Sequence, residues 1–217
     1  MLAAVALLAG CVWLFVAIAD EVIEGDTRAL DKALLMVLRD RADPARPWGP
    51  AWVQEMARDF TALGGVGVLT LLTAAAIGYL VMQRKRHAAL LVLIAVAGGQ
   101  VVSLALKASF DRARPDLVPH GSIVYTASFP SGHAMMAAVT YLTIGALLAR
   151  VHAPFAVKGY VLGLALLLTL LVGLSRLYLG VHWPTDVAAG WAVGAAWAMF
   201  SSLVMHWLQR RGQVEPS

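Results

Sequence analysis

The sequence contains one cysteine, Cys11, and only 14% of its 217 residues are charged. A single cysteine excludes an internal disulfide and any metal site built from several cysteines. No internal repeat, low-complexity tract or long linker divides the chain, so we expect one domain over residues 1–217. Hydrophobic residues make up 60% of the chain, and the mean hydropathy is +0.74. This balance is far from that of a soluble domain and predicts an integral membrane protein.

The formal net charge of +4 does not indicate a nucleic-acid partner. A nucleic-acid interface gathers its basic residues on one solvated face, because they must follow a phosphate backbone. Here the basic residues are scattered between apolar runs. We therefore expect the lipid bilayer, and not a nucleic acid, to be the main environment of this chain.

Apolar runs of nearly the length of a membrane-crossing helix recur along the chain. A helix needs ~20 residues to cross the hydrocarbon, so we predict an all-α integral membrane bundle of six transmembrane helices. The spans are expected at approximately residues 2–19, 63–82, 88–106, 131–149, 159–174 and 184–208. The first run ends in Ala17-Ile18-Ala19, which resembles a signal-peptide cleavage site. No Lys or Arg precedes that run, so we expect a retained helix.

Residues 20–62 form the one long polar stretch, with six basic and nine acidic residues. Within it four leucines recur at helical spacing, and two tryptophans flank Pro50. The leucines are Leu30, Leu34, Leu35 and Leu38, and the tryptophans are Trp48 and Trp52. This pattern predicts one or two amphipathic helices lying at the membrane interface, where indole rings are enriched. A solvated loop with a packed apolar face is the alternative for any single residue here.

The distribution of basic residues predicts the orientation. The short turns 84–87 and 150–158 and the tail hold seven Lys or Arg, with Glu215 as the one acid. The other side holds ten, so the raw count disagrees, but the positive-inside rule is taken from short loops. We therefore expect both termini in the cytoplasm, in the cell (inner) membrane. The polar motifs between the spans then lie on the periplasmic or extracellular face.

Three of these polar motifs hold side chains suited to a phosphate group. Phosphoryl transfer needs donors in fixed positions, because charge on three oxygens must be held through the transition state. Guanidinium forks match phosphate oxygens and lysine adds a point charge, so three cations are expected to converge: Lys107, Arg114 and Arg176. Two other arginines, Arg58 and Arg112, are interpreted as interfacial cations that extend toward lipid headgroups.

Two histidines accompany these cations. Pro130 and Ser131 mark a helix start, where free backbone N–H groups bind anions, and Gly132 permits close approach of an oxygen. His133 in that first turn is a candidate general acid. His182 precedes the sixth span, and Asp186 follows it by about one helical turn. The carboxylate is expected to reach one imidazole nitrogen, leaving the other free to attack.

Together the three motifs resemble the signature of the type 2 phosphatidic acid phosphatase superfamily. The signature reads Lys-x6-Arg-Pro, Pro-Ser-Gly-His and Ser-Arg-x5-His-x3-Asp, and its eleven fixed positions all occur in order within residues 107–186. The resemblance implies a metal-independent phosphatase that needs no cofactor. It implies that His182 is the nucleophile that forms a phosphohistidine, that Asp186 holds it, and that His133 protonates the leaving oxygen. The implied phosphoryl-binding residues are Lys107, Arg114, Ser131, Gly132 and Arg176.

A site at headgroup depth takes a phosphate whose tail stays in the bilayer. The candidate substrates are phosphatidic acid, phosphatidylglycerophosphate, an isoprenyl diphosphate such as the undecaprenyl carrier, and a lipid A-like glycolipid. Tyr125 and Phe129 are candidates to line the access route, with packing as the alternative. A homo-oligomer is possible in principle, but nothing in the sequence indicates one.

Two other functions stay open at this point. Outward-facing cations near helix starts also describe the port of a lipid or anion transporter or flippase. The superfamily also includes soluble vanadate-dependent haloperoxidases with similar site residues. The long apolar spans argue against that soluble branch.

Overall fold

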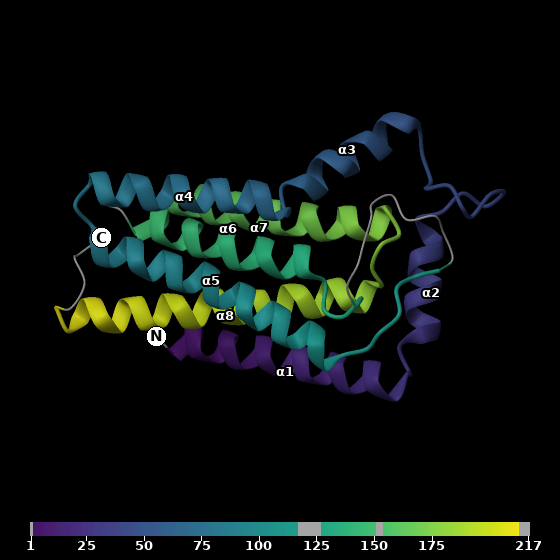
Figure 1. The fold of residues 1–217 in the computed structure, drawn as a ribbon, viewed down its shortest axis with the longest axis horizontal. Coiled ribbons are helices and arrows are strands. Elements are labelled where there is room, and N and C mark those ends of the chain that lie inside the picture. The colour runs from purple at the N-terminus through teal and green to yellow at the C-terminus, as the bar shows by residue number, and fades with distance from the viewer. Residues whose placement is uncertain (1, 117–126, 151–153, 213–217) are drawn as a thin grey trace.

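The computed structural model describes residues 2–116, 127–150 and 154–212, and the regular structure in these ranges is α-helical. The helices are α1 (Leu2–Glu24), α2 (Arg28–Val37), α3 (Ala51–Ala62), α4 (Val66–Met82), α5 (Arg86–Ser109), α6 (Gly132–Arg150), α7 (Phe155–Tyr178) and α8 (Pro184–Arg210). The long helices lie side by side along one axis (Figure 1). Helix α1 begins and α8 ends at one end of this bundle, and α2 lies across the opposite end (Figure 1).

Among the described residues, five helices are long and apolar enough to cross a membrane. Helices α3 and α4 pass the same criterion together, although they are bent by 48° at the break between them. The prediction of an all-α membrane bundle is therefore confirmed, and the chain is a multi-pass membrane protein. The polar segment also contains two helices, α2 and α3, as the leucine and tryptophan pattern predicted.

Several helices extend past the predicted spans, because the hydropathy pattern ends at the hydrocarbon edge while backbone hydrogen bonding continues. Helix α7 runs to Tyr178 and so carries Arg176 in its last turn. The span predicted at 63–82 instead begins at Val66, since the chain bends just before it. At that bend a Cβ on Gly64 would lie 2.4 Å from Val172 Cγ1. A glycine therefore lets the bend lie directly against α7.

Helix α6 is the centre of the bundle, and 67% of the residues in Gly132–Ala149 are buried. It packs closely against α8 at two glycines of α8. A Cβ on Gly190 would lie 2.7 Å from the Ser131 carbonyl oxygen, and one on Gly194 would lie 2.5 Å from that of Met135. Small residues allow this close approach of two helices in lipid. The contact brings the start of α8 beside the Pro-Ser-Gly-His segment at the start of α6.

The inward face of α2 differs from the predicted leucine stripe. Leu35 is fully buried, but Leu30 and Leu34 are 56% and 47% exposed. The residues that share the buried side with Leu35 are charged, Asp31 one turn before it and Arg39 one turn after it. Arg39 Nη2 donates to the Tyr178 carbonyl oxygen at 2.9 Å, where a cation meets the negative end of the α7 dipole. Two charged side chains thus attach α2 to the end of the bundle.

Candidate active site

His182 lies in the turn that joins α7 to α8. Helix α7 ends with Gly180 N–H bonded to the Leu177 carbonyl at 2.9 Å and Val181 N–H to that of Arg176 at 3.2 Å. These two bonds form a Schellman motif, whose left-handed position is filled by Gly180 at φ 70°. Helix α8 then starts at Pro184, a residue suited to a first helical position. The turn leaves His182 buried, with 2% of its surface exposed.

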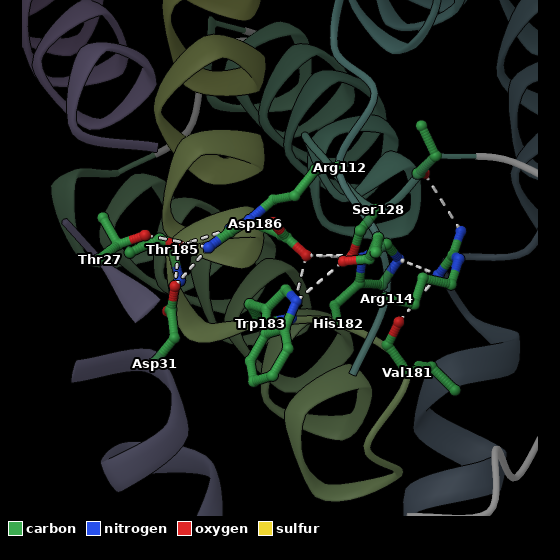
Figure 2. Close-up of polar contacts among 12 residues, drawn as sticks. Thr27, Asp31, Arg112, Arg114, Ser128, Val181, His182, Trp183, Thr185 and Asp186 are labelled. Atoms are coloured by element: carbon green, nitrogen blue, oxygen red, sulfur yellow. Dashed lines mark hydrogen bonds and ion pairs between the residues drawn. The ribbon is translucent and has the colours of Figure 1, made fainter. Parts of the chain in front are cut away.

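The two ring nitrogens of His182 face different partners (Figure 2). Nδ1 lies 3.4 Å from Asp186 Oδ2, and Nε2 lies 3.2 Å from Arg114 Nη1. A guanidinium can only donate, so Nε2 accepts and Nδ1 carries the proton that faces the carboxylate. The four-residue spacing therefore produces the expected pair, with the Nε2 lone pair directed toward a cation.

Asp186 is fully buried and is held by several donors. Its Oδ2 accepts from the Trp183 backbone N–H at 2.9 Å and from the Ser128 hydroxyl. Its Oδ1 accepts from Arg112 Nη1 at 2.5 Å. With both oxygens engaged, the carboxylate has a fixed direction relative to the imidazole of His182.

The three predicted cations meet beside His182. Lys107 Nζ donates to the Ala127 carbonyl oxygen at 2.9 Å, and Arg114 Nη2 reaches the same oxygen at 3.4 Å. Arg176 donates to Thr61 Oγ1 at 3.1 Å. Lys107 is close enough to both arginines for electrostatic repulsion. Like charges held together in a buried site favour a bound anion, because an anion relieves their repulsion.

The start of α6 completes this cluster. Ser131 is fully buried, and a Cβ on Gly132 would lie 3.1 Å from Lys107 Cε. His133 is close enough to Arg176 and His182 to interact with them electrostatically. In the part of the chain that the structure describes, Ser131 Oγ and Arg176 Nε are buried without a hydrogen-bond partner. Buried polar atoms usually have partners, so these two are available to oxygen atoms of a ligand.

A cavity of about 550 Å³ begins at this cluster and extends between α4 and α5. Lys107, Gly132 and His133 form its polar end, and residues such as Ile77 and Leu93 line its apolar part. From Lys107 to Leu93 the α5 helix rises by about 21 Å. This exceeds the roughly 15 Å depth of one leaflet's hydrocarbon. The cavity therefore connects a cluster of cations to an apolar space as long as a lipid tail.

Burial lowers the pKa of His182 to about 4, with Asp186 opposing the shift and Arg176 and Arg114 adding to it. The imidazole is therefore neutral near pH 7, with an unprotonated nitrogen. Burial also lowers the pKa of Arg114, and the charge of Asp186 opposes this shift. An arginine remains charged under such conditions, so the site combines a neutral base with fixed cations.

The family model described as the PAP2 superfamily matches residues 88–212. The chain belongs to this superfamily. It is 37% identical over 147 residues to phosphatidylglycerophosphatase B of Bacillus subtilis, covering 66% of this chain and 70% of that protein. It is 40% identical over 76 residues to an undecaprenyl-diphosphatase of Sulfolobus acidocaldarius, covering 35% and 32% of the two chains.

The fold is also similar to that of a solved PAP2 protein. The crystal structure of a transmembrane PAP2-type phosphatidylglycerolphosphate phosphatase from Bacillus subtilis matches with a TM-score of 0.77 and 29% identity. The match covers 97% of this chain and 99% of the other. The resemblance stated from the three motifs is thus confirmed, and the likeness extends to the helices outside them.

The interpretation of Arg112 as an interfacial cation was wrong. Arg112 does not extend toward lipid headgroups, because its side chain is 14% exposed and forms ion pairs with Asp31 and Asp186. Arg58, in contrast, is 47% exposed and pairs with Glu55 on the surface of α3. The x6 segment of the first motif carries no requirement for Arg112, so the motif alone gave no sign of its role.

Two further residues of this candidate site, Asp31 and Ser128, were not identified from the sequence. A signal existed for Asp31, since it lies one turn before Leu35 on the inward face of an amphipathic helix. No comparable signal marked Ser128. Phe129 is fully buried and packs on Phe15 and Phe110, so it is a core residue and does not line the access route. Tyr125 lies outside the described residues.

Proposed function

We propose that this protein hydrolyses a lipid phosphomonoester or diphosphate through a phosphohistidine on His182, without a metal ion. The observation that carries this proposal is the direction of the His182 Nε2 lone pair. It points into the cluster of Lys107, Arg114 and Arg176, while Nδ1 is held by Asp186. A nucleophile, the residue that orients it and the cations for a phosphoryl group are thereby in one place.

In the first step, Nε2 of His182 attacks phosphorus and the bond from phosphorus to the lipid oxygen breaks. His133 gives its proton to that oxygen, so the lipid leaves as an alcohol, or as a monophosphate if the substrate is a diphosphate. Asp186 stabilises the positive charge that the ring gains when the N–P bond forms. Lys107, Arg114 and Arg176 hold the equatorial oxygens, with Ser131 and the backbone N–H of Gly132.

In the second step, water attacks the phosphorus atom of the phosphohistidine. His133, now neutral, takes a proton from this water, and the N–P bond breaks to release inorganic phosphate. His182 returns to its neutral form. The donor set consists of cations, hydroxyl and backbone groups, which suit an anion and not a metal ion. Among the described residues, no three or more His, Cys, Asp or Glu side chains are arranged to hold a metal.

The cavity between α4 and α5 supports a lipid substrate. Its polar end is shared with the cation cluster, and most of its remaining lining residues are apolar. A lipid phosphate presents the same division, with a charged head and a hydrocarbon tail. We infer that the phosphate binds at Lys107 and His133 while the tail lies along Leu93 and Ile77. Phosphatidylglycerophosphate, phosphatidic acid and undecaprenyl diphosphate all have this form.

We further propose that the site faces the periplasmic or extracellular side of the cell membrane. The basic turn between α4 and α5 lies beside the end of α8, since Lys85 and Gln209 line one cavity. This end is opposite to α2 and to the start of α8, which follows His182 (Figure 1). The positive-inside rule places short basic turns in the cytoplasm, and both termini would accompany them.

A substrate panel with the purified protein in detergent tests the proposal. Inorganic phosphate release is measured from phosphatidic acid, phosphatidylglycerophosphate, undecaprenyl diphosphate and a water-soluble phosphate ester, with and without EDTA. We expect at least one lipid to be hydrolysed much faster than the soluble ester, and EDTA to leave the rate unchanged. Loss of activity with EDTA that a divalent ion restores would contradict the metal-free mechanism. Lipid translocation without phosphate release would instead indicate a flippase.

A further inference from the structure

Arg112 connects the candidate catalytic pair to helix α2 (Figure 2). Its Nη1 donates to Asp186 Oδ1 at 2.5 Å and to Thr185 Oγ1 at 2.8 Å. Its Nη2 donates to Asp31 Oδ2 at 2.6 Å and to Thr27 Oγ1 at 3.0 Å. Each terminal nitrogen therefore makes two hydrogen bonds, as many as the hydrogens it carries. Arg112 is engaged by the protein on both sides, unlike a cation arranged to receive a phosphate.

Asp31 is fully buried and binds the start of α8 from another helix. Its Oδ1 accepts from the Thr185 backbone N–H at 2.9 Å, and its Oδ2 accepts from the Thr185 hydroxyl at 2.7 Å. The first N–H groups of a helix have no partner within it, so Asp31 caps α8 in place of a local residue. The cap lies one residue before Asp186.

The residues just after this helix contact the other side of the His182 turn. Arg39, two residues beyond the end of α2, is buried and donates to the carbonyl oxygen of Tyr178 at the end of α7. Helix α2 and the residues that follow it thus contact the last residues of α7 through a cation and the first residues of α8 through an anion. Each charge opposes the dipole of the helix end that it meets.

We propose that Arg112 and Asp31 are positioning residues for the His182–Asp186 pair. Arg112 fixes the direction of the Asp186 carboxylate, and Asp31 balances the charge of Arg112. Asp186 therefore keeps a net negative charge for the imidazole. This inference rests on the proposed role of His182 as nucleophile.

The sign of the charge alternates along the series Asp31, Arg112 and Asp186. Removing the charge of Arg112 and removing that of Asp31 therefore have opposite effects on the pKa of His182. Arg112 withdraws negative charge from Asp186, and Asp31 reduces that withdrawal. If Arg112 is removed, Asp186 stabilises a protonated imidazole more strongly, and the pKa of His182 rises. If Asp31 is neutralised, Arg112 is balanced by Asp186 alone and the pKa falls. A residue that served only to hold the fold together would not produce shifts of opposite sign.

The first measurement is steady-state kinetics of Arg112→Met, Arg112→Lys and Asp31→Asn with a lipid phosphate. Misplacing a group that orients a reacting residue typically costs about 10- to 100-fold. We expect Arg112→Met to lower kcat by this factor, while KM and the inhibition constant of inorganic phosphate change less than about threefold. Arg112→Lys is expected to recover only part of kcat, because one ammonium group cannot span both carboxylates.

The second measurement is the acidic limb of kcat/KM against pH, corrected for the ionisation of the substrate. Attack needs a neutral imidazole, so activity is lost as the pH falls through the pKa of His182. The limb is expected to move to higher pH in Arg112→Met and to lower pH in Asp31→Asn. Arg112→Lys keeps the charge and is expected to leave the limb in place. The other charged or titratable groups around the pair are the same in all variants: Lys107, Arg114, His133 and Arg176.

Two control variants separate positioning from structure. Arg39→Met removes the contact of α2 with α7 but leaves Asp31 and Arg112 in place, and Asp26→Asn changes an exposed carboxylate near the start of α2. Neither is expected to move the acidic limb. Shifts of the same sign in Arg112→Met and Asp31→Asn, or the same effects in Arg39→Met, would overturn the proposal.

If Arg112→Met does not fold, Arg112→Lys and Asp31→Asn still test the proposal. Arg112→Lys must lower kcat without moving the acidic limb, and Asp31→Asn must move the acidic limb to lower pH. Phosphoenzyme formation is measured in the same wild-type preparation. Its absence would remove the proposed function, whereas a normal phosphoenzyme with unshifted variants would remove this inference alone.

Discussion

The His182–Asp186 pair lies between two sets of cations that have different partners. On one side, Lys107 contacts a backbone carbonyl oxygen and Arg176 contacts a threonine hydroxyl, and both oxygens are neutral. On the other side, Arg112 lies between two carboxylates. A cation whose protein contacts are neutral retains its charge for a ligand, whereas one held by carboxylates acts within the protein. The partners of a cation therefore indicate its function better than its distance from the histidine does.

The largest expected effect comes from the residue between the two sets. His182→Ala is predicted to lower phosphate release by about 10⁴-fold or more, because a covalent mechanism has no substitute for its nucleophile. Circular dichroism and thermal stability in detergent check that the variant still folds. Turnover near the wild-type rate in a folded variant would rule out the nucleophile assignment.

The next effect concerns the cations with neutral partners. Lys107→Met and Arg176→Lys are each predicted to lower kcat/KM by about 10²-fold, the usual cost of losing one transition-state donor. The matched control is Arg58→Met, because Arg58 is an exposed cation on α3 that pairs with Glu55. It is expected to change kcat/KM less than about twofold. An equal loss in the control would mean that bulk positive charge, and not the cluster, attracts the substrate.

A smaller effect is expected in the cavity, away from both sets. Ala97 lines the cavity on α5 and its side chain is exposed to it. Ala97→Trp would fill part of the space assigned to the tail, so kcat/KM for a long-chain lipid phosphate is predicted to fall about tenfold. A short, water-soluble phosphate ester needs no such space and serves as the matched substrate. Equal losses for both substrates would show that the substitution disturbs the site itself.

The smallest effect is a displacement along the pH axis. Burial lowers the pKa of His182 to about 4, whereas a solvated imidazole titrates near 6.5. Activity that needs the neutral ring is therefore expected to persist below pH 6.5 and to be lost as the pH falls toward about 4. The measurement is kcat/KM against pH after correction for the second ionisation of the phosphate, determined by ³¹P NMR. Because kcat/KM reports ionisations of the free enzyme, a limb at 6.5 or above would mean that the histidine is not buried before substrate binds.

The sequence alone predicted the fold well, since spans of nearly 20 apolar residues leave few alternatives to a helical bundle. Predicted boundaries differed from observed ones where hydropathy and hydrogen bonding end at different residues, as at Tyr178. The bend before Val66 was not predicted, because two glycines in an apolar run are equally compatible with a straight helix packed closely on a neighbour.

The motif residues were predicted from fixed spacing, and the structure brings them together from α5, α6, α7, α8 and the connecting segments. The supporting residues were not predicted, because their partners are distant in sequence. Arg112 meets Asp31 and Asp186 only after the chain has folded, with separations of 81 and 74 residues. No local pattern encodes such contacts, and the one available signal was an acid beside Leu35 on a helix face.

The most direct test is to trap the phosphoenzyme. The protein is mixed with a lipid whose terminal phosphate carries ³²P, quenched in alkali within milliseconds, and digested to locate the label. An acid-labile, alkali-stable label on the peptide that contains His182, absent in His182→Ala and lost when unlabelled substrate is added, is the result expected here. Labelled inorganic phosphate released at the full rate with no label on the protein at any time would contradict a covalent mechanism.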